Sequence, residues 1–194
     1  MTAIKAVAVY CGALTGADPV HRDSAYRLGR ALADANVDLV FGGGSVGLMG
    51  VISDGVADAG GRAVGIITRS LIRQEVANSR LTRLEVVDSM HARKQRMFEL
   101  ADAFVALPGG VGTVDETIEV ITWRQLGLHD KPIVIVDDSG YWEPLERLMR
   151  HIVGRGFAAP SLHGLYTIVP DVGDVLPTLQ AAPPPALPDK PEIT

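Results

Sequence analysis

The chain alternates short runs of apolar, β-branched residues with longer amphipathic segments. Seven apolar runs are typical of strands buried on both faces of a parallel sheet, at residues 6–10, 38–42, 63–68, 84–87, 103–107, 132–136 and 166–169. Helical periodicity lies between them, near residues 20–35, 47–59, 89–101, 113–126, 142–153 and 171–180. This alternation predicts an α/β, Rossmann-like fold: a doubly wound, mainly parallel sheet of about seven strands with helices on both faces.

The apolar pattern also predicts the domain organisation. The length of 194 residues fits one domain, which we expect to span residues 1–181. The last segment, 182–194, reads APPPALPDKPEIT, is rich in proline and has no apolar periodicity. We therefore expect it to be a disordered tail whose removal leaves the function intact.

Composition narrows the class of partner. The 18 Lys and Arg are spread among 23 Asp and Glu, giving a net charge of -5, which argues against nucleic-acid binding and favours a small molecule. The single cysteine, Cys11, excludes an internal disulfide and fits a cytoplasmic protein. No apolar run approaches the ~18 residues of a membrane span, so we expect no membrane association. The histidines do not recur at metal-ligand spacing, and we expect neither a metal nor a cofactor.

Three glycine-rich turns follow predicted strands: CGALTG, GGGSVGLMG and PGGVGT. In a doubly wound sheet, ligands bind outside the carboxyl ends of the strands. The third turn leads into a helix, where backbone N–H groups and the helix dipole suit a phosphate. The residues concerned are Gly109, Gly110, Val111, Gly112 and Thr113. A tight strand-to-helix turn explains the same glycines, and close packing explains those of the second turn, so these alternatives stay open.

The helix after the third turn carries acids where an anion site would repel them. Thr113 and Glu116 match a capping box, in which the threonine caps the helix and the glutamate reaches back to it. Helical projection predicts one stripe facing the sheet, formed by Val114, Ile118 and Ile121. A second stripe lies nearly opposite, formed by Glu116, Val120 and Trp123. An apolar outer stripe around a carboxylate predicts a second buried face, either a subunit interface, a pocket wall or both.

The segment SMHARKQRMFELA predicts a helix capped by Asp88 or Ser89. Its apolar stripe contains Arg93 and Lys94. Buried cations are costly unless an anion meets them, although their long stems can also extend to solvent. An anionic ligand is the better interpretation of these two residues.

Five segments together, GGGSVGLMG, MHARK, PGGVGTVDE, TWRQLGLHDKP and GYW, closely resemble the Lonely Guy (LOG) family of cytokinin riboside 5'-monophosphate phosphoribohydrolases. The resemblance runs from about Tyr10 to Phe157. It implies hydrolysis of the N-glycosidic bond of an N6-prenylated adenosine 5'-monophosphate, releasing the free base and ribose 5-phosphate, with AMP as a second substrate. It also implies a Rossmann-like homodimer with the site near the subunit interface.

The resemblance assigns roles to particular residues. The family's catalytic arginine and glutamate fall on Arg93 and Glu116, with Arg93 acting either on the leaving base or in positioning. The remaining nucleotide-binding positions fall on Glu75, Lys94, the turn at 109–113 and Thr122. The chain departs from the family pattern in CGALTG, where Ala13 and Leu14 replace two hydroxyl donors, and at residues 67–69, where a proline is replaced. Both departures bear on the preferred substrate side chain.

Two other functions fit parts of the pattern. A non-catalytic nucleotide or pterin-phosphate carrier would use the same phosphate turn, yet would not need Glu116 facing a pocket. An amino-acid decarboxylase, a label often attached to this family, would need a cofactor-binding lysine, and no segment shows a lysine in such a setting.

Overall fold

The computed structural model describes residues 4–73 and 80–182. Within them, one sheet contains seven strands in the order β4-β3-β2-β1-β5-β6-β7, and every neighbouring pair is parallel. The strands are β1 (Ala6–Tyr10), β2 (Asp38–Phe41), β3 (Ala63–Thr68), β4 (Arg83–Val87), β5 (Ala103–Ala106), β6 (Ile133–Val136) and β7 (Thr167–Val169). The predicted seven-stranded, doubly wound α/β fold is confirmed.

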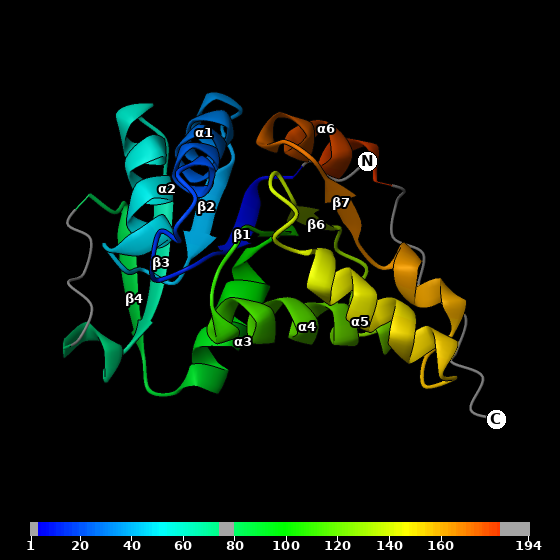
Figure 1. Ribbon diagram of the computed structural model, residues 1–194. Helices are drawn as coiled ribbons and strands as arrows, with labels where there is room; N and C mark the ends of the chain where they lie inside the picture. Colours follow the sequence, from blue (N-terminus) through cyan, green and yellow to red (C-terminus); the bar gives the residue numbers. More distant parts are fainter. Residues whose placement is uncertain (1–3, 74–79, 183–194) are drawn as a thin grey trace.

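Six α-helices cover the two faces of the sheet (Figure 1). They are α1 (Val20–Asp34), α2 (Gly47–Asp58), α3 (Met90–Leu100), α4 (Val111–Gln125), α5 (Glu143–Gly154) and α6 (Val175–Ala181). Helices α1, α2 and α6 pack on one face, and α3, α4 and α5 pack on the other. Among the described residues, no helix is long and apolar enough to cross a membrane.

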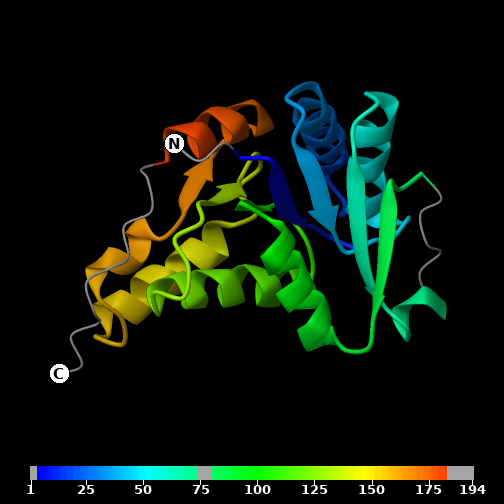
Figure 2. The same ribbon diagram turned by 180° about the vertical axis from the view of Figure 1, so that it is seen from behind.

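The central strands are apolar throughout because both of their faces are covered. In β1, Val7 and Val9 face the layer of α1, α2 and α6, whereas Ala8 and Tyr10 face the layer of α3, α4 and α5. Successive side chains of a strand point to opposite faces, so a strand between two helical layers has no polar position. The view from behind shows the same two layers (Figure 2).

The strand order reverses between β1 and β5, which pair from Val7 with Ala103 onward. The turns that follow these two strands are joined, because the Gly12 N–H donates to the Pro108 carbonyl at 3.1 Å. The turn after β2 joins them through the Leu48 N–H, which donates to the Gly12 carbonyl at 2.9 Å. The three glycine turns therefore meet at the edge where ligands bind in such sheets.

Two helix boundaries differ from the prediction. Helix α4 begins at Val111, two residues earlier than expected. The segment expected to form one helix at 171–180 contains a short 3-10 helix, Val172–Asp174, followed by α6. Pro177 lies in the first turn of α6, where the missing N–H of a proline removes no helical hydrogen bond.

Candidate active site

Arg93 and Glu116 meet between α3 and α4. The Ser89 side chain caps α3 by accepting from the Ala92 N–H at 3.1 Å, which confirms one of the two predicted caps. Arg93 follows one turn later and is buried, with its Nη1 atom 3.8 Å from Glu116 Oε1. The two side chains are only 9% and 12% exposed. The two residues matched to the family's catalytic pair are therefore in contact.

Backbone around Arg93 holds its guanidinium in place. Arg93 Nε donates to the Ile66 carbonyl at 2.9 Å, within β3. A β-carbon at Gly42 would lie 1.9 Å from Arg93 Nη2, so a side chain at that position would displace the guanidinium. At Gly42, the second glycine turn therefore makes room for a charged side chain of the same chain. The sequence showed the glycines but not what approaches them.

Burial changes the acidity of Glu116. Its removal from solvent raises the pKa of the carboxyl to about 7, and Arg93 offsets only part of this effect. Asp115 and Glu119 raise the pKa further, while Lys94 lowers it. A carboxyl with a pKa near 7 can both accept and release a proton at neutral pH, as an acid–base catalyst must.

The capping-box interpretation of Glu116 is wrong. Helix α4 begins at Val111 with Gly110 as its N-cap, so Thr113 lies inside the first turn and is buried. The Thr113 carbonyl accepts from Thr117 Oγ1 at 2.7 Å. The contact found for Glu116 is with Arg93 rather than with the start of its own helix.

The predicted orientation of α4 is right in part: Ile121 is buried, whereas Val114 and Ile118 are only partly buried against the core. The buried residues of the helix are Thr113, Thr117, Val120 and Ile121. The second stripe is buried as predicted, and it faces α3: Glu116 contacts Arg93, and Trp123 packs edge-on against Phe98 with ring centroids 5.0 Å apart. Helix α4 is apolar on several sides and contacts both the sheet and α3, so its periodicity identified the inner face only in part.

The glycines of the third turn have different functions. A β-carbon at Gly109 would lie 2.1 Å from Thr113 Oγ1 and 2.8 Å from the Gly12 nitrogen, so packing requires glycine there. At Gly110 and Gly112 a β-carbon would meet nothing within 4 Å, and neither has a positive φ. The fold therefore does not require these two glycines, and they leave open space beside the start of α4. Val111, between them, is exposed.

Lys94 reaches the first turns of α4, where acids surround it. Its Nζ atom lies 3.0 Å from Asp115 Oδ2 and 2.9 Å from Glu119 Oε1. Burial lowers the pKa of Lys94, but the bonds to Glu119 and Asp115 outweigh it and raise the pKa overall. The interaction with these two acids was not foreseen.

One of the predicted nucleotide-binding residues, Thr122, is not in this cluster. Thr122 is exposed, and its hydroxyl donates to the Ile118 carbonyl at 2.8 Å, six residues beyond Glu116 along α4. Glu75 lies outside the described residues.

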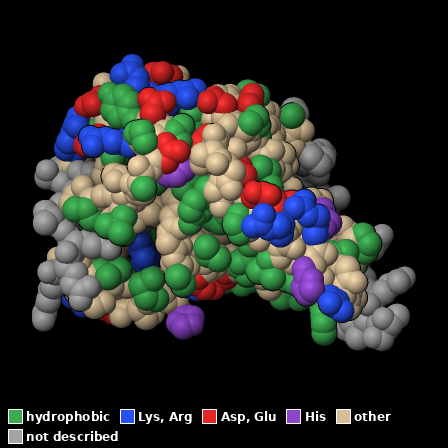
Figure 3. All heavy atoms as spheres, in the orientation of Figure 1, with side chains coloured by type: hydrophobic (Ala, Val, Ile, Leu, Met, Phe, Trp, Pro, Cys, Tyr) green, Lys and Arg blue, Asp and Glu red, His purple; other side chains and the backbone are tan. Residues whose placement is uncertain are grey.

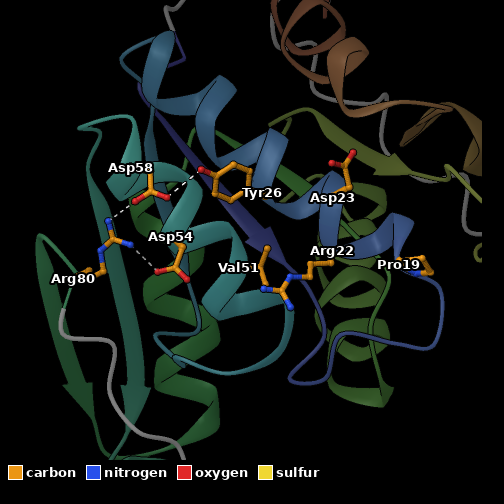
Figure 4. A pocket seen from close by; sticks show the side chains of 8 residues that line it. All are labelled: Pro19, Arg22, Asp23, Tyr26, Val51, Asp54, Asp58 and Arg80. Atoms are coloured by element: carbon orange, nitrogen blue, oxygen red, sulfur yellow. Dashed lines mark hydrogen bonds and ion pairs between the residues drawn. The ribbon is translucent and has the colours of Figure 1, made fainter.

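A pocket of about 430 Å³ lies on the other face of the sheet, between α1 and α2 (Figure 4). Its lining includes Arg80, whose guanidinium is held by Asp54 at 3.1 Å and Asp58 at 2.5 Å. The Tyr26 hydroxyl donates to Asp58 at 3.0 Å. These contacts pair Arg80, Asp54, Asp58 and Tyr26 with one another, and the pocket is separated from Arg93 and Glu116 by the sheet.

Comparison with known proteins identifies the family. A family model described as possible lysine decarboxylase matches residues 49–179. A cytokinin riboside 5'-monophosphate phosphoribohydrolase of Rhodococcoides fascians is 42% identical over 178 residues, covering 91% of this chain and 90% of the relative. The chain belongs to the Lonely Guy (LOG) family. Its LOG relative in Arabidopsis thaliana, LOG1, is 39% identical over 176 residues, covering 91% of this chain and 83% of the relative.

Solved structures share the LOG fold at lower identity. A molybdenum cofactor binding protein of Rippkaea orientalis has a TM-score of 0.72 and 20% identity, covering 93% of this chain and 98% of its own. The molybdenum cofactor carrier protein of Chlamydomonas reinhardtii has a TM-score of 0.71 and 19% identity, covering 91% and 96%. These similarities show the fold alone.

The description "possible lysine decarboxylase" finds no matching site among the described lysines. Lys94 is paired with two acids, and Lys131 Nζ donates to the Phe98 carbonyl at 2.7 Å. Lys5 is exposed at the start of β1. A Schiff-base lysine needs a free amine, but the amines of Lys94 and Lys131 are both engaged within the chain, although burial lowers the pKa of Lys131. Within residues 4–73 and 80–182, no three His, Cys, Asp or Glu side chains are gathered as a metal site requires.

Proposed function

We propose that this LOG-family chain hydrolyses the N-glycosidic bond of adenosine 5'-monophosphates, N6-prenylated or plain, releasing the base and ribose 5-phosphate. The observation that carries the proposal is the buried Glu116 carboxyl beside Arg93, at the end of a glycine turn that opens α4. The names of the relatives, which share about 40% of its residues over about 90% of the chain, support the same reaction.

The 5'-phosphate would bind at the start of α4. The first four N–H groups of an α-helix have no partner within the helix, and the positive end of the helix dipole lies at the same point. Gly110 and Gly112 leave space for the phosphate to approach these groups. Glu116, one turn further along, would then face the ribose.

Glycosidic cleavage develops positive charge on the ribose, which a carboxylate stabilises. In the proposed reaction the C1'–N9 bond breaks and its electron pair goes to the base. Water attacks C1' and gives a proton to Glu116, and Glu116 passes a proton to the departing base, so that water is added across the bond. The hydrogen bond from Arg93 to Ile66 and its ion pair with Glu116 favour a positioning function, in which the arginine holds the carboxylate in place beside the ribose.

The proposal includes a cytoplasmic homodimer. Hydrophobic side chains gather over α4 and α5 (Figure 3), where Leu126 and Leu148 are exposed and Val114 and Ile118 are only partly buried. A second copy on this face would cover them, and would account for a nucleotide-binding Thr122 that lies away from Glu116 within one chain. Light scattering should give twice the mass of one chain, and a monomer at micromolar concentration would contradict this part.

The test of the function is base release from N6-isopentenyladenosine 5'-monophosphate and from AMP. Wild type should release base, and Glu116→Gln should lose at least about a hundredfold in rate, because acid–base groups contribute about 10²–10⁴-fold. This substitution cannot disturb a helix cap, since Glu116 forms none. Glu143→Gln is the matched control, because Glu143 is exposed on α5 and pairs with Arg147. If wild type binds the nucleotides without releasing base, the carrier replaces the hydrolase.

A further inference from the structure

A polar network behind the phosphate turn has no part in the proposed reaction. It joins α1 to the turn between β6 and α5. The Ser24 hydroxyl donates to Asp138 Oδ2, and His21 Nδ1 lies 3.6 Å from Asp138 Oδ1. The His21 and Asp138 side chains are only 9% and 6% exposed. His21 Nδ1 and Asp138 Oδ1 have no hydrogen-bond partner among the described residues, so the one hydrogen bond here is that of Ser24, and His21 is held by packing and by its ion pair with Asp138.

Tyr141 rests on this network and reaches the phosphate turn. Its ring packs edge-on against His21, with ring centroids 5.9 Å apart, and against Trp142 at 5.2 Å. Its hydroxyl donates a hydrogen bond to the Gly109 carbonyl, 32 residues away in the sequence. Tyr141 is 39% exposed, so its ring is supported on one side by His21 and Trp142, while its hydroxyl holds one peptide group of the turn.

The held peptide is the one that presents the Gly110 N–H. A trans peptide is planar, so its carbonyl and the N–H of the next residue point in opposite directions. With the Gly109 carbonyl turned toward Tyr141, the Gly110 N–H points away from it. The preceding carbonyl, of Pro108, is likewise held by the Gly12 N–H. Both carbonyls therefore point away from the proposed phosphate site, where their oxygens would repel the anion.

We infer that Tyr141 is a positioning residue that orients the phosphate-binding turn through the Gly109 carbonyl, and that His21 and Asp138 support its ring. The inference rests on the proposed function, since it names the part of the nucleotide that this contact serves. Without the hydroxyl, the Gly109–Gly110 peptide can rotate, and glycine on both sides offers little resistance. The 5'-phosphate would lose binding, whereas the reacting groups on α3 and α4 would stay in place.

The test compares Tyr141→Phe with Tyr166→Phe. Both changes remove one hydroxyl and one hydrogen bond, and Tyr166 donates to Glu146 at 2.5 Å beside α5. Tyr141→Phe should raise KM for AMP about five- to tenfold, the value of one hydrogen bond, while kcat stays within about twofold. Tyr166→Phe should change neither KM for AMP nor kcat. Calorimetry with ribose 5-phosphate should show the same weakening in Tyr141→Phe, and calorimetry with adenine should show none.

Equal affinity of wild type and Tyr141→Phe for ribose 5-phosphate would overturn the inference. An equal loss of affinity for adenine would also overturn it, because it would indicate that the whole site is disordered. The outcome is separable from the proposed function. If wild type binds ribose 5-phosphate but never releases base, the hydrolase proposal fails while the calorimetric comparison still decides the function of Tyr141. If Tyr141→Phe binds and reacts like wild type, the hydrolase proposal stands and this inference fails.

Discussion

Two arginine–carboxylate clusters lie on opposite faces of the same sheet, and they differ in the direction of their pKa shifts. Arg80 approaches Asp54 and Asp58 closely, at 3.1 and 2.5 Å, but its side chain is 46% exposed. Arg93 and Glu116 are separated by 3.8 Å and are almost completely buried. The hydrogen bond from Arg80 lowers the pKa of Asp58, whereas burial raises that of Glu116 to about 7 despite Arg93.

The difference shows that burial, more than contact distance, determines which acid can act as a catalyst at neutral pH. An exposed carboxylate beside an arginine is stabilised in its charged form and has little tendency to take a proton. A buried carboxylate with one distant partner is poised between its two forms. The cluster on α3 and α4 therefore has the properties of an active site, although the α1–α2 pocket has the closer ion pairs.

The largest expected difference in kcat/KM is between the variants Arg93→Gln and Arg80→Gln. Loss of Arg93 removes the positive charge beside Glu116 and should lower kcat/KM for AMP by about 10²-fold or more. Arg80→Gln should stay within about twofold of wild type, because its partners lie across the sheet. Base release measures both, with circular dichroism as a check on folding. Similar losses in the two variants would remove the distinction between the clusters.

The pH dependence of the reaction sharpens the comparison. The proposed mechanism uses ionised Glu116, whose pKa is about 7, so kcat/KM should fall about tenfold per pH unit below that value and level off above it. The matched variant Asp58→Asn should give the same curve, since the pKa of Asp58 is lowered and the residue has no part in the reaction. A rate independent of pH between 5 and 8 would contradict the assignment.

The smallest contrast is in folding stability. The folded-state pKa of Glu116 lies above its ordinary value of 4.5, so between pH 4.5 and 7 the folded protein holds more protons than the unfolded chain. Wild type should therefore lose stability as pH rises through this window, by about 3 kcal/mol, while Glu116→Gln should not. Asp58 has the opposite sign: its stabilising contribution is present above its ordinary pKa and is lost as pH falls.

Urea unfolding at pH 5 and pH 8 measures this contrast. The stability of Glu116→Gln relative to wild type should increase between the two pH values, and that of Asp58→Asn should not. Parallel behaviour of all three proteins would mean that Glu116 is as well hydrated as Asp58.

The sequence predicted most of the fold, because strands buried on both faces are apolar throughout and glycine turns separate them from helices. It also selected Arg93 as a buried cation that needs an anionic partner, but it favoured a ligand, whereas the anion in contact with Arg93 is Glu116 of the same chain. It predicted only in part which side of α4 faces inward, because that helix is apolar on several sides. The function of Gly42 and the bond from Tyr141 to Gly109 depend on contacts between distant segments, which periodicity does not report.

The most direct test of the account is a crystal structure of the Glu116→Gln variant with AMP bound, in which the substrate should persist. The phosphate should lie on the N–H groups at the start of α4, and the ribose should lie beside Arg93 and the substituted side chain on α4. AMP bound instead between α1 and α2, against Arg80, would contradict the central claim that the buried pair is the active site.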